Sequence, residues 1–228
     1  MSQSPFFPTF DRLAPTIPIF PLSGVLLLPR GLLPLNIFEP RYIAMVDDAL
    51  SSDRMIGMVQ PTTPDGGATI PEIYPLGCAG RITSFDETDD GRYLITLTGI
   101  CRFRAGTELA TTRGYRRVEA DWSAFRDDLA GCDMEGGGCG LDRARLDAAL
   151  GAYFRRHGIS ANWDAIKGTP DERLVTSLAM ICPFDPPEKQ ALLEAPTPAD
   201  RAELVVSLIE MAVLTPESGP GPGGDSRH

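Results

Sequence analysis

The 228-residue sequence predicts an α+β protein in which a curled, partly closed β-sheet is followed by an α-helical bundle. Short apolar runs separated by turn-forming residues dominate residues 1–122, and the last two of these runs show period-two alternation. Apolar stripes with helical spacing dominate residues 141–214. Hydrophobic residues make up 43% of the chain and charged residues 23%, so a chain of this length can bury a core without a metal or disulfides.

Six short strands are expected in the first half, over residues 17–20, 32–38, 55–59, 77–85, 93–103 and 115–122. Pro34 lacks the N–H that a central strand needs, so the second strand is predicted at a sheet edge or as a bulged strand. Asp90-Gly91 predicts a hairpin between the fourth and fifth strands. Together these strands favour a small sheet that curls toward a barrel.

An early helix is expected to begin at Glu39-Pro40, because proline suits the first helical position. Residues 123–140 contain three consecutive glycines and few large apolar side chains, which indicates a connection between two lobes. Four helices are expected after it, beginning near Leu141, Thr169-Pro170, Asp185-Pro186 and Thr197-Pro198, where capping signals occur. The Pro- and Gly-rich residues 215–228 predict a disordered tail.

The charge and apolar patterning exclude several classes of protein. A formal net charge of −10 opposes binding to the phosphate backbone of nucleic acids. The sequence shows no signal peptide and no run of about 20 apolar residues, so a cytoplasmic protein with no membrane partner is expected.

The five cysteines are irregularly spaced. Cys132 and Cys139, the closest pair, are interpreted as incidental thiols, with a reversible disulfide as the alternative.

Groups that perform common catalysis are missing from the sequence. Neither lysine, Lys167 or Lys189, follows a glycine as a phosphate-binding loop requires, and both are expected in polar helical surroundings. No Gly-x-Ser-x-Gly turn and no close Cys or His pair for zinc occurs. His157 follows two arginines at a predicted helix end, where a cation suits the helix dipole. We therefore expect a protein that is not an enzyme and needs no cofactor or metal.

Three segments carry a resemblance to a known family. They are Ile17-Pro18-Ile19-Phe20-Pro21-Leu22, Leu33-Pro34-Leu35-Asn36-Ile37-Phe38-Glu39-Pro40-Arg41-Tyr42, and Gly80-Arg81-Ile82 followed by Gly99 and Arg102-Phe103-Arg104. Together they resemble the N-terminal, substrate-binding domain of Lon proteases, in its stand-alone bacterial form without ATPase and peptidase domains, over roughly residues 14–214. The resemblance implies a PUA-like pseudo-barrel lobe before the helical lobe. It also implies binding of unfolded or partner proteins, as an adaptor or holdase in protein quality control.

The candidate peptide-binding residues lie in the second of these segments or just before it. They are Pro29, Leu32, Leu33, Pro34, Glu39, Arg41 and Tyr42. The apolar members can accept an extended chain if they are exposed beside a sheet edge, and otherwise they fill the core. Glu39 is expected to cap the helix, Arg41 to pair with a carboxylate or grip a ligand, and Tyr42 to be a core aromatic.

An RNA- or nucleotide-binding PUA-like module is the alternative function. A cluster of arginines motivates it, namely Arg102, Arg104, Arg113, Arg116 and Arg117. Glu119 and Asp121 are interleaved with these arginines, which favours a solvated strand face instead. The oligomeric state and the identity of any partner are not predicted.

Overall fold

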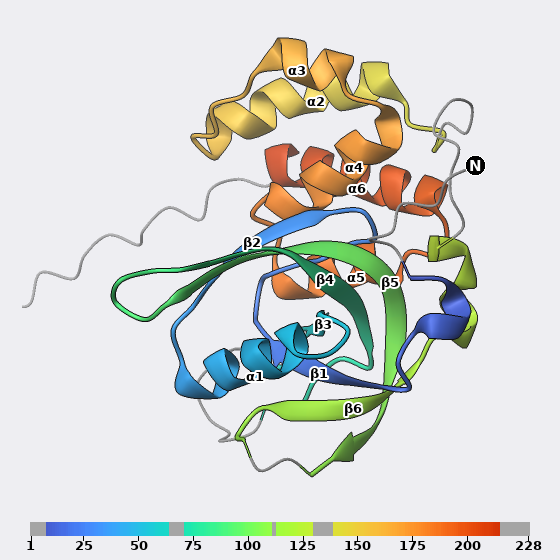
Figure 1. Ribbon diagram of the computed structural model, residues 1–228. Helices are drawn as coiled ribbons and strands as arrows, with labels where there is room; N and C mark the ends of the chain where they lie inside the picture. Colours follow the sequence, from blue (N-terminus) through green and yellow to red (C-terminus); the bar gives the residue numbers. More distant parts are fainter. Residues whose placement is uncertain (1–7, 64–70, 111–112, 130–138, 215–228) are drawn as a thin grey trace, which may run out of the picture.

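The structure, a computed structural model, describes residues 8–63, 71–110, 113–129 and 139–214. Figure 1 shows the sheet and α1 in one half of the molecule and α2, α3, α4 and α6 stacked in the other, while α5 lies against β4. The first half contains η1 (Phe10–Arg12), β1 (Thr16–Pro21), β2 (Leu32–Ile37), α1 (Pro40–Leu50), β3 (Met55–Val59), β4 (Leu76–Glu87), β5 (Tyr93–Leu109), β6 (Arg116–Asp121) and η2 (Ser123–Leu129). The second contains α2 (Arg143–Arg156), α3 (Trp163–Gly168), α4 (Asp171–Ile181), α5 (Pro186–Glu194) and α6 (Pro198–Leu214).

The six strands form one sheet in the order β2-β5-β4-β3-β1-β6. β1 and β3 are parallel, and all other pairs are antiparallel. β5 is long enough to pair with β2 over residues 93–98, with β4 over residues 93–104 and with β6 over residues 104–109. The sheet therefore curls back on itself, because β6 pairs with both β1 and β5. The mixed sheet and helices confirm the predicted α+β class.

β2 lies at the end of the strand order, as Pro34 predicts. Its ladder with β5 runs without a register shift from Leu32 opposite Thr98 to Ile37 opposite Tyr93. Because alternate residues of an antiparallel strand bond to the same neighbour, an unbroken ladder places Pro34 where its missing N–H faces away from β5. Along the part of the chain that the structure describes, no strand pairs with the other edge of β2.

Gly99 allows the chain before β2 to lie directly on β5. The Gly99 N–H donates to the Gly31 carbonyl (2.8 Å), and the Arg30 N–H donates to the Gly99 carbonyl (2.8 Å). A Cβ atom at Gly99 would overlap the carbonyl oxygen of Leu28. The glycine of the third sequence segment is thus required by a close approach of two backbones.

The helical lobe contains five helices rather than the four expected. The short α3 was missed, and Asn162 caps it by accepting from the Ala165 N–H (3.1 Å). Thr169 does not cap α4 as predicted, because its hydroxyl donates backward to the Ala165 carbonyl (2.7 Å). The capping box of Asp185 is confirmed.

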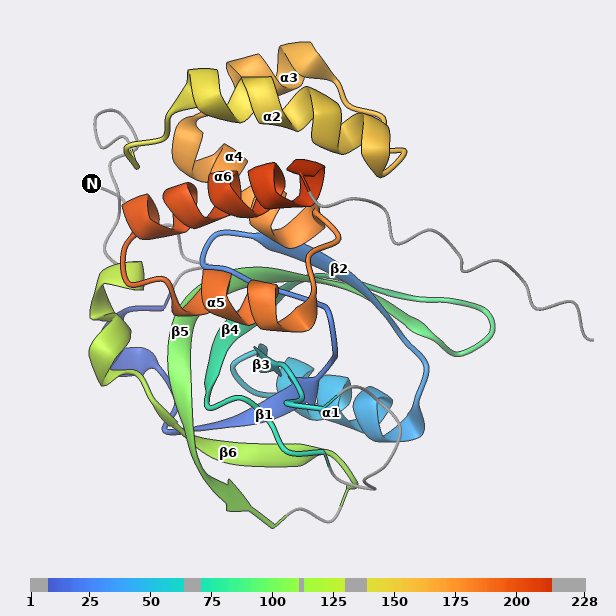
Figure 2. The ribbon, with the colours of Figure 1, turned by 180° about the vertical axis from the view of Figure 1, so that it is seen from behind.

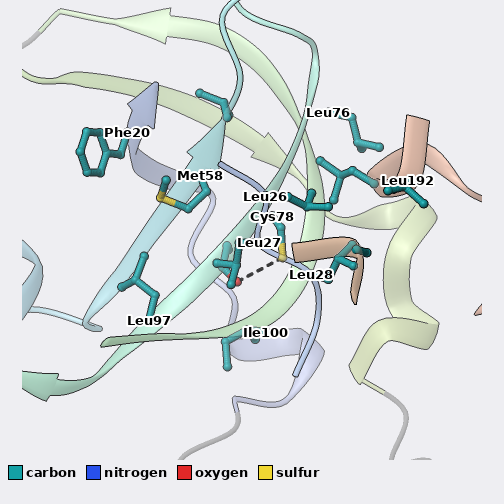
Figure 3. Close-up of a cluster of buried hydrophobic side chains, with 14 of the residues drawn as sticks. Phe20, Leu26, Leu27, Leu28, Met58, Leu76, Cys78, Leu97, Ile100 and Leu192 are labelled. Carbon is teal, nitrogen blue, oxygen red and sulfur yellow. Dashed lines mark hydrogen bonds between the residues drawn. The ribbon is translucent and has the colours of Figure 1, made fainter. Parts of the chain in front are cut away.

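One hydrophobic cluster extends through both lobes. Leu192 of α5 reaches the β-sheet side, where it lies beside Leu76 of β4 and Leu26 (Figure 3). Within the predicted connection 123–140, residues 123–129 form η2 against β5. Residues 130–138, which include Cys132, and the predicted tail 215–228 lie outside the described residues. The domain boundaries predicted above stay predictions.

Candidate functional site

Two buried arginines bind the C-terminal end of α5, Arg102 from β5 and Arg201 from α6. The Arg102 guanidinium donates to both oxygens of Asp128 (2.9 Å each) and to the carbonyls of Leu193 (3.2 Å) and Ala195 (2.8 Å). Arg201 donates to the Leu192 carbonyl (2.9 Å). Carbonyls of the last helical turn have no partner within the helix and carry the negative end of its dipole, so they suit cations. Burial lowers the pKa of Arg201 to about 10, and repulsion from Arg102 adds to this effect.

The prediction that Arg102 belongs to a solvated strand face is wrong, because only 7% of the residue is exposed. Other members of the predicted arginine cluster form local pairs. Arg113 pairs with Asp48, Arg116 with Glu108 (2.8 Å), and Arg117 donates to the Thr16 hydroxyl (2.9 Å). These contacts engage four of the five arginines that motivated the alternative of nucleic-acid binding, whereas Arg104 is exposed.

Further polar groups fix α5 from its N-terminal side. The Lys189 ammonium donates to the Gly24 carbonyl (2.7 Å), and the Gln190 amide donates to the Leu76 carbonyl (3.2 Å). The Gln60 amide donates to the Pro186 carbonyl (3.1 Å). Lys189 was expected in polar surroundings, yet it is buried, and burial lowers its pKa. We call this set of contacts around α5 the closed side of the lobe interface.

On its other side, the lobe interface is open. A hollow of about 470 Å³ lies between the chain entering β2 and α4, and we call it the interlobe groove. Figure 2 shows α4 and β2 on facing sides of the lobe boundary. The lining residues are Arg30, Gly31 and Leu32 from the β lobe and Glu172, Arg173, Thr176, Ser177, Met180 and Ile181 from α4. Leu32 is 59% exposed and Ile181 is 74% exposed, so the groove presents apolar side chains to solvent.

Gly31 sets the depth of the groove. A Cβ atom at Gly31 would overlap the sulfur of Met180, so the glycine lets α4 approach the β lobe closely. Arg30, which precedes it, has a positive φ of 65°. Its guanidinium pairs with Glu172 (3.0 Å) and so joins the lobes across the groove.

A second, smaller hollow of about 220 Å³ lies between the end of β1, β2 and the start of α1. Three candidate residues line it. The Glu39 carboxylate accepts from Arg41 (2.9 Å) instead of capping the helix as predicted, because the neighbouring guanidinium offers a charged donor. The Arg41 guanidinium lies 4.5 Å from the centre of the Tyr42 ring, and Tyr42 packs on Phe20 with ring centres 4.2 Å apart.

The structure therefore divides six of the seven candidate residues between two hollows and the strand that joins them, whereas Pro29 precedes that strand. Leu32 lines the interlobe groove, whereas Glu39, Arg41 and Tyr42 line the smaller hollow. Pro34 is exposed on β2 between them, whereas Leu33 and Pro29 are half-buried and Leu33 packs against the core.

Sequence reasoning missed the α4 wall of the groove. Helical spacing from Leu174 and Leu178 places Ile181 on the buried apolar stripe of that helix, but it lies at the helix end and is 74% exposed. The signal that could have indicated its exposure is its position as a large apolar residue directly after the last buried turn. Helical periodicity alone does not reveal this exposure. Arg173 was not singled out at all.

The described residues contain no group of three or more His, Cys, Asp or Glu side chains arranged to hold a metal ion. Cys78, Cys101, Cys139 and Cys182 are buried free thiols, and burial raises the pKa of each. Across the ranges that the structure describes, no helix is long and apolar enough to cross a membrane.

Comparison with solved structures first defines the class of fold. A crystal structure of a Lon N-terminal domain protein from Xanthomonas campestris matches with a TM-score of 0.54 and 24% identity, over 84% of this chain and 97% of that one. The N-terminal domain of a Mycobacterium avium complex Lon protease matches with a TM-score of 0.55 and 14% identity, over 85% and 97% of the two chains. The fold is thus that of Lon N-terminal domains.

Sequence comparison then gives the family. Residues 16–211 match the model of the ATP-dependent protease La (LON) substrate-binding domain, so the chain belongs to this family, a family of substrate-recognition modules. Lon protease 2 of Myxococcus xanthus is 26% identical over 85% of this chain, and Lon protease 2 of Sorangium cellulosum is 28% identical over 63%. The matched regions span only 23% and 17% of those two proteases.

Proposed function

We propose that the protein captures unfolded or partner polypeptides in the interlobe groove and along β2, without catalysing a reaction on them. In this role it acts in the cytoplasm as an adaptor or holdase for protein quality control. The observation that carries the proposal is the exposure of Leu32 and Ile181 on the two walls of one groove. Contiguous exposed apolar surface of this kind is typical of protein-interaction sites.

β2 supports the proposal through its backbone. Apart from the N–H that Pro34 lacks, the free edge of β2 offers N–H and C=O groups to which an extended polypeptide can pair, and alternate side chains then face pockets that select the sequence. Leu32, Pro34, Asn36 and Phe38 are exposed at alternate positions from the interlobe groove toward the smaller hollow. An extended segment is therefore a better fit than a folded surface.

The test is fluorescence anisotropy of a labelled, permanently unfolded polypeptide titrated with this protein in the absence of ATP. Saturable binding is expected, and Leu32→Asp should weaken it by at least about tenfold, because an aliphatic contact is replaced by a charge that must be desolvated. Leu214→Asp is the matched control, since Leu214 is 80% exposed and does not line the groove.

Circular dichroism and the free energy of unfolding check that both variants remain folded. Absence of saturable binding by the unaltered protein would remove the proposal. If Leu32→Asp and Leu214→Asp weakened polypeptide binding equally, the binding surface would lie outside the interlobe groove.

A further inference from the structure

The interlobe groove combines its apolar surface with one uncompensated positive charge. Its lining contains two arginines and one glutamate. Arg30 and Glu172 neutralise each other through their ion pair (3.0 Å), which leaves Arg173. Among the described residues Arg173 has no hydrogen-bond or ion-pair partner for its side chain, and it is exposed.

Helix stability does not explain the position of this arginine. Arg173 is the third residue of α4, which spans Asp171–Ile181. The N-terminal turn carries the positive end of the helix dipole and favours acidic residues, which Asp171 and Glu172 provide. A cation at the third position opposes the dipole. Helix stability therefore gives no reason for Arg173 to lie at the rim of the groove.

We propose that the groove selects segments of polypeptide in which an aliphatic side chain is followed or preceded at short distance by a carboxylate that pairs with Arg173. This inference rests on the proposed function and names the class of substrate for the same groove. The aliphatic side chain lies between Leu32, Met180 and Ile181. The carboxylate belongs to an Asp or Glu side chain, because charge complementarity at the rim favours an anion.

The helix sets the spacing between the two groups. Arg173 and Met180 are seven residues apart on α4, which corresponds to about 10 Å along the axis. An extended segment lying along the helix covers this distance in about three residues at its rise of about 3.3 Å per residue. The flexible arginine side chain adds reach, so the selected spacing is about two to four residues.

The choice of an acidic segment goes against the charge of the whole protein. With a formal net charge of −10, the chain repels anionic peptides at long range. A preference for Glu over Gln in a bound peptide therefore has to come from a local contact. This makes the preference diagnostic for Arg173.

The experiment uses three labelled unfolded peptides that are identical except for one residue, Glu, Gln or Lys, placed three positions from a leucine. Anisotropy titrations with the full chain should show the Glu peptide binding about two- to fivefold tighter than the Gln peptide, as expected for a solvent-exposed ion pair. Arg173→Glu should reverse the order, so that the Lys peptide binds tightest.

Arg155→Glu is the matched control. Arg155 is exposed on α2, does not line the groove, and its substitution changes the net charge from −10 to −12, as Arg173→Glu does. The control variant should retain the preference for Glu. Should Arg173→Glu fail to fold, Arg173→Gln removes the charge alone and should abolish the preference.

The remaining outcomes separate the two proposals. Equal binding of the three peptides, with loss of binding in Leu32→Asp, would overturn the selection of acidic segments while leaving polypeptide capture in place. A preference for Glu that persists in Arg173→Glu would also overturn it. No binding of any peptide by the unaltered protein would overturn both.

Discussion

The two lobes meet on a closed side and an open side, and these are built from different interactions. At the closed side, Arg102, Arg201 and Lys189 are almost completely buried, and each donates to backbone carbonyls of the other lobe or of α5. At the open side, Leu32 and Ile181 remain in solvent, and the partly exposed ion pair of Arg30 with Glu172 crosses the gap. Buried, fully satisfied polar contacts are directional, so they fix how the lobes are oriented.

This difference explains how an apolar groove can stay open. Exposed apolar surfaces on two lobes tend to close on each other unless the lobes are held apart by other contacts. The hydrogen bonds around α5 and the Leu192 contacts set the relative position of the lobes, and α4 then faces β2 across an unfilled space. Stability therefore belongs mainly to the closed side and binding to the open side.

The largest expected effect is at Arg102. Arg102→Met should lower the free energy of unfolding by about 3–5 kcal/mol, because Asp128 is left as a buried charge without its partner. Urea denaturation measures this loss. The double variant Arg102→Met/Asp128→Leu should lose less than the sum of the single variants. A loss below about 1 kcal/mol for Arg102→Met would contradict the assignment of stability to the closed side.

Gly31→Ala is expected to have the next largest effect. The new methyl group displaces Met180, and crowding of this kind costs about 1–3 kcal/mol, toward the lower end because Met180 is flexible. Gly168→Ala is the control, since a Cβ there meets no atom within 4 Å, and it should change stability by less than about 0.5 kcal/mol. Thermal unfolding compares the two, and equal effects would show that α4 does not approach Gly31 closely.

The buried thiols predict a loss of stability at alkaline pH. Burial raises the pKa of Cys101 from its usual value of 9.0 to about 12. The folded state keeps the proton while the unfolded state releases it, so this stabilisation is complete below pH 9 and is lost as the pH rises toward 12. One such group contributes a slope of at most about 1.4 kcal/mol per pH unit.

Cys101→Ala should reduce this slope between pH 9 and 11, whatever its effect on stability at neutral pH. Denaturation at a series of pH values provides the measurement. An unchanged slope would show that Cys101 ionises in the folded state as readily as in the unfolded state.

The smallest effect on stability is expected at Ile181, and it sharpens the contrast between the two sides. Ile181→Asp replaces an exposed side chain, and its charge at the C-terminal end of α4 opposes the helix dipole, so the free energy of unfolding should fall by less than about 1 kcal/mol. Polypeptide binding should nevertheless weaken at least about tenfold in the anisotropy titration. If Ile181→Asp lowered stability but kept the affinity for the polypeptide, the assignment of binding to the open side and of stability to the closed side would be wrong.

The strands and most helices were predictable because their signals are local. Short apolar runs located the first four strands and period-two alternation located the last two, while Pro34 predicted the edge position of β2 and Asp185 with Glu188 predicted the start of α5. The short α3 was missed because six residues provide too little periodicity. Thr169 was misassigned because the same hydroxyl can cap the next helix or close the preceding one, and only the packing of α3 decides between these.

The sequence by itself determined the α+β class, the order of elements and the resemblance to Lon substrate-binding domains. These depend on the residues near each position along the chain. Only the tertiary structure decided that Arg102 is buried while Ile181 is exposed, and that Leu32 faces α4 across a groove. The physical reason is that exposure depends on neighbours far away in the sequence. Arg102 is buried because α5 lies over it, and no described element covers Ile181. Periodicity within one segment carries no information about such neighbours.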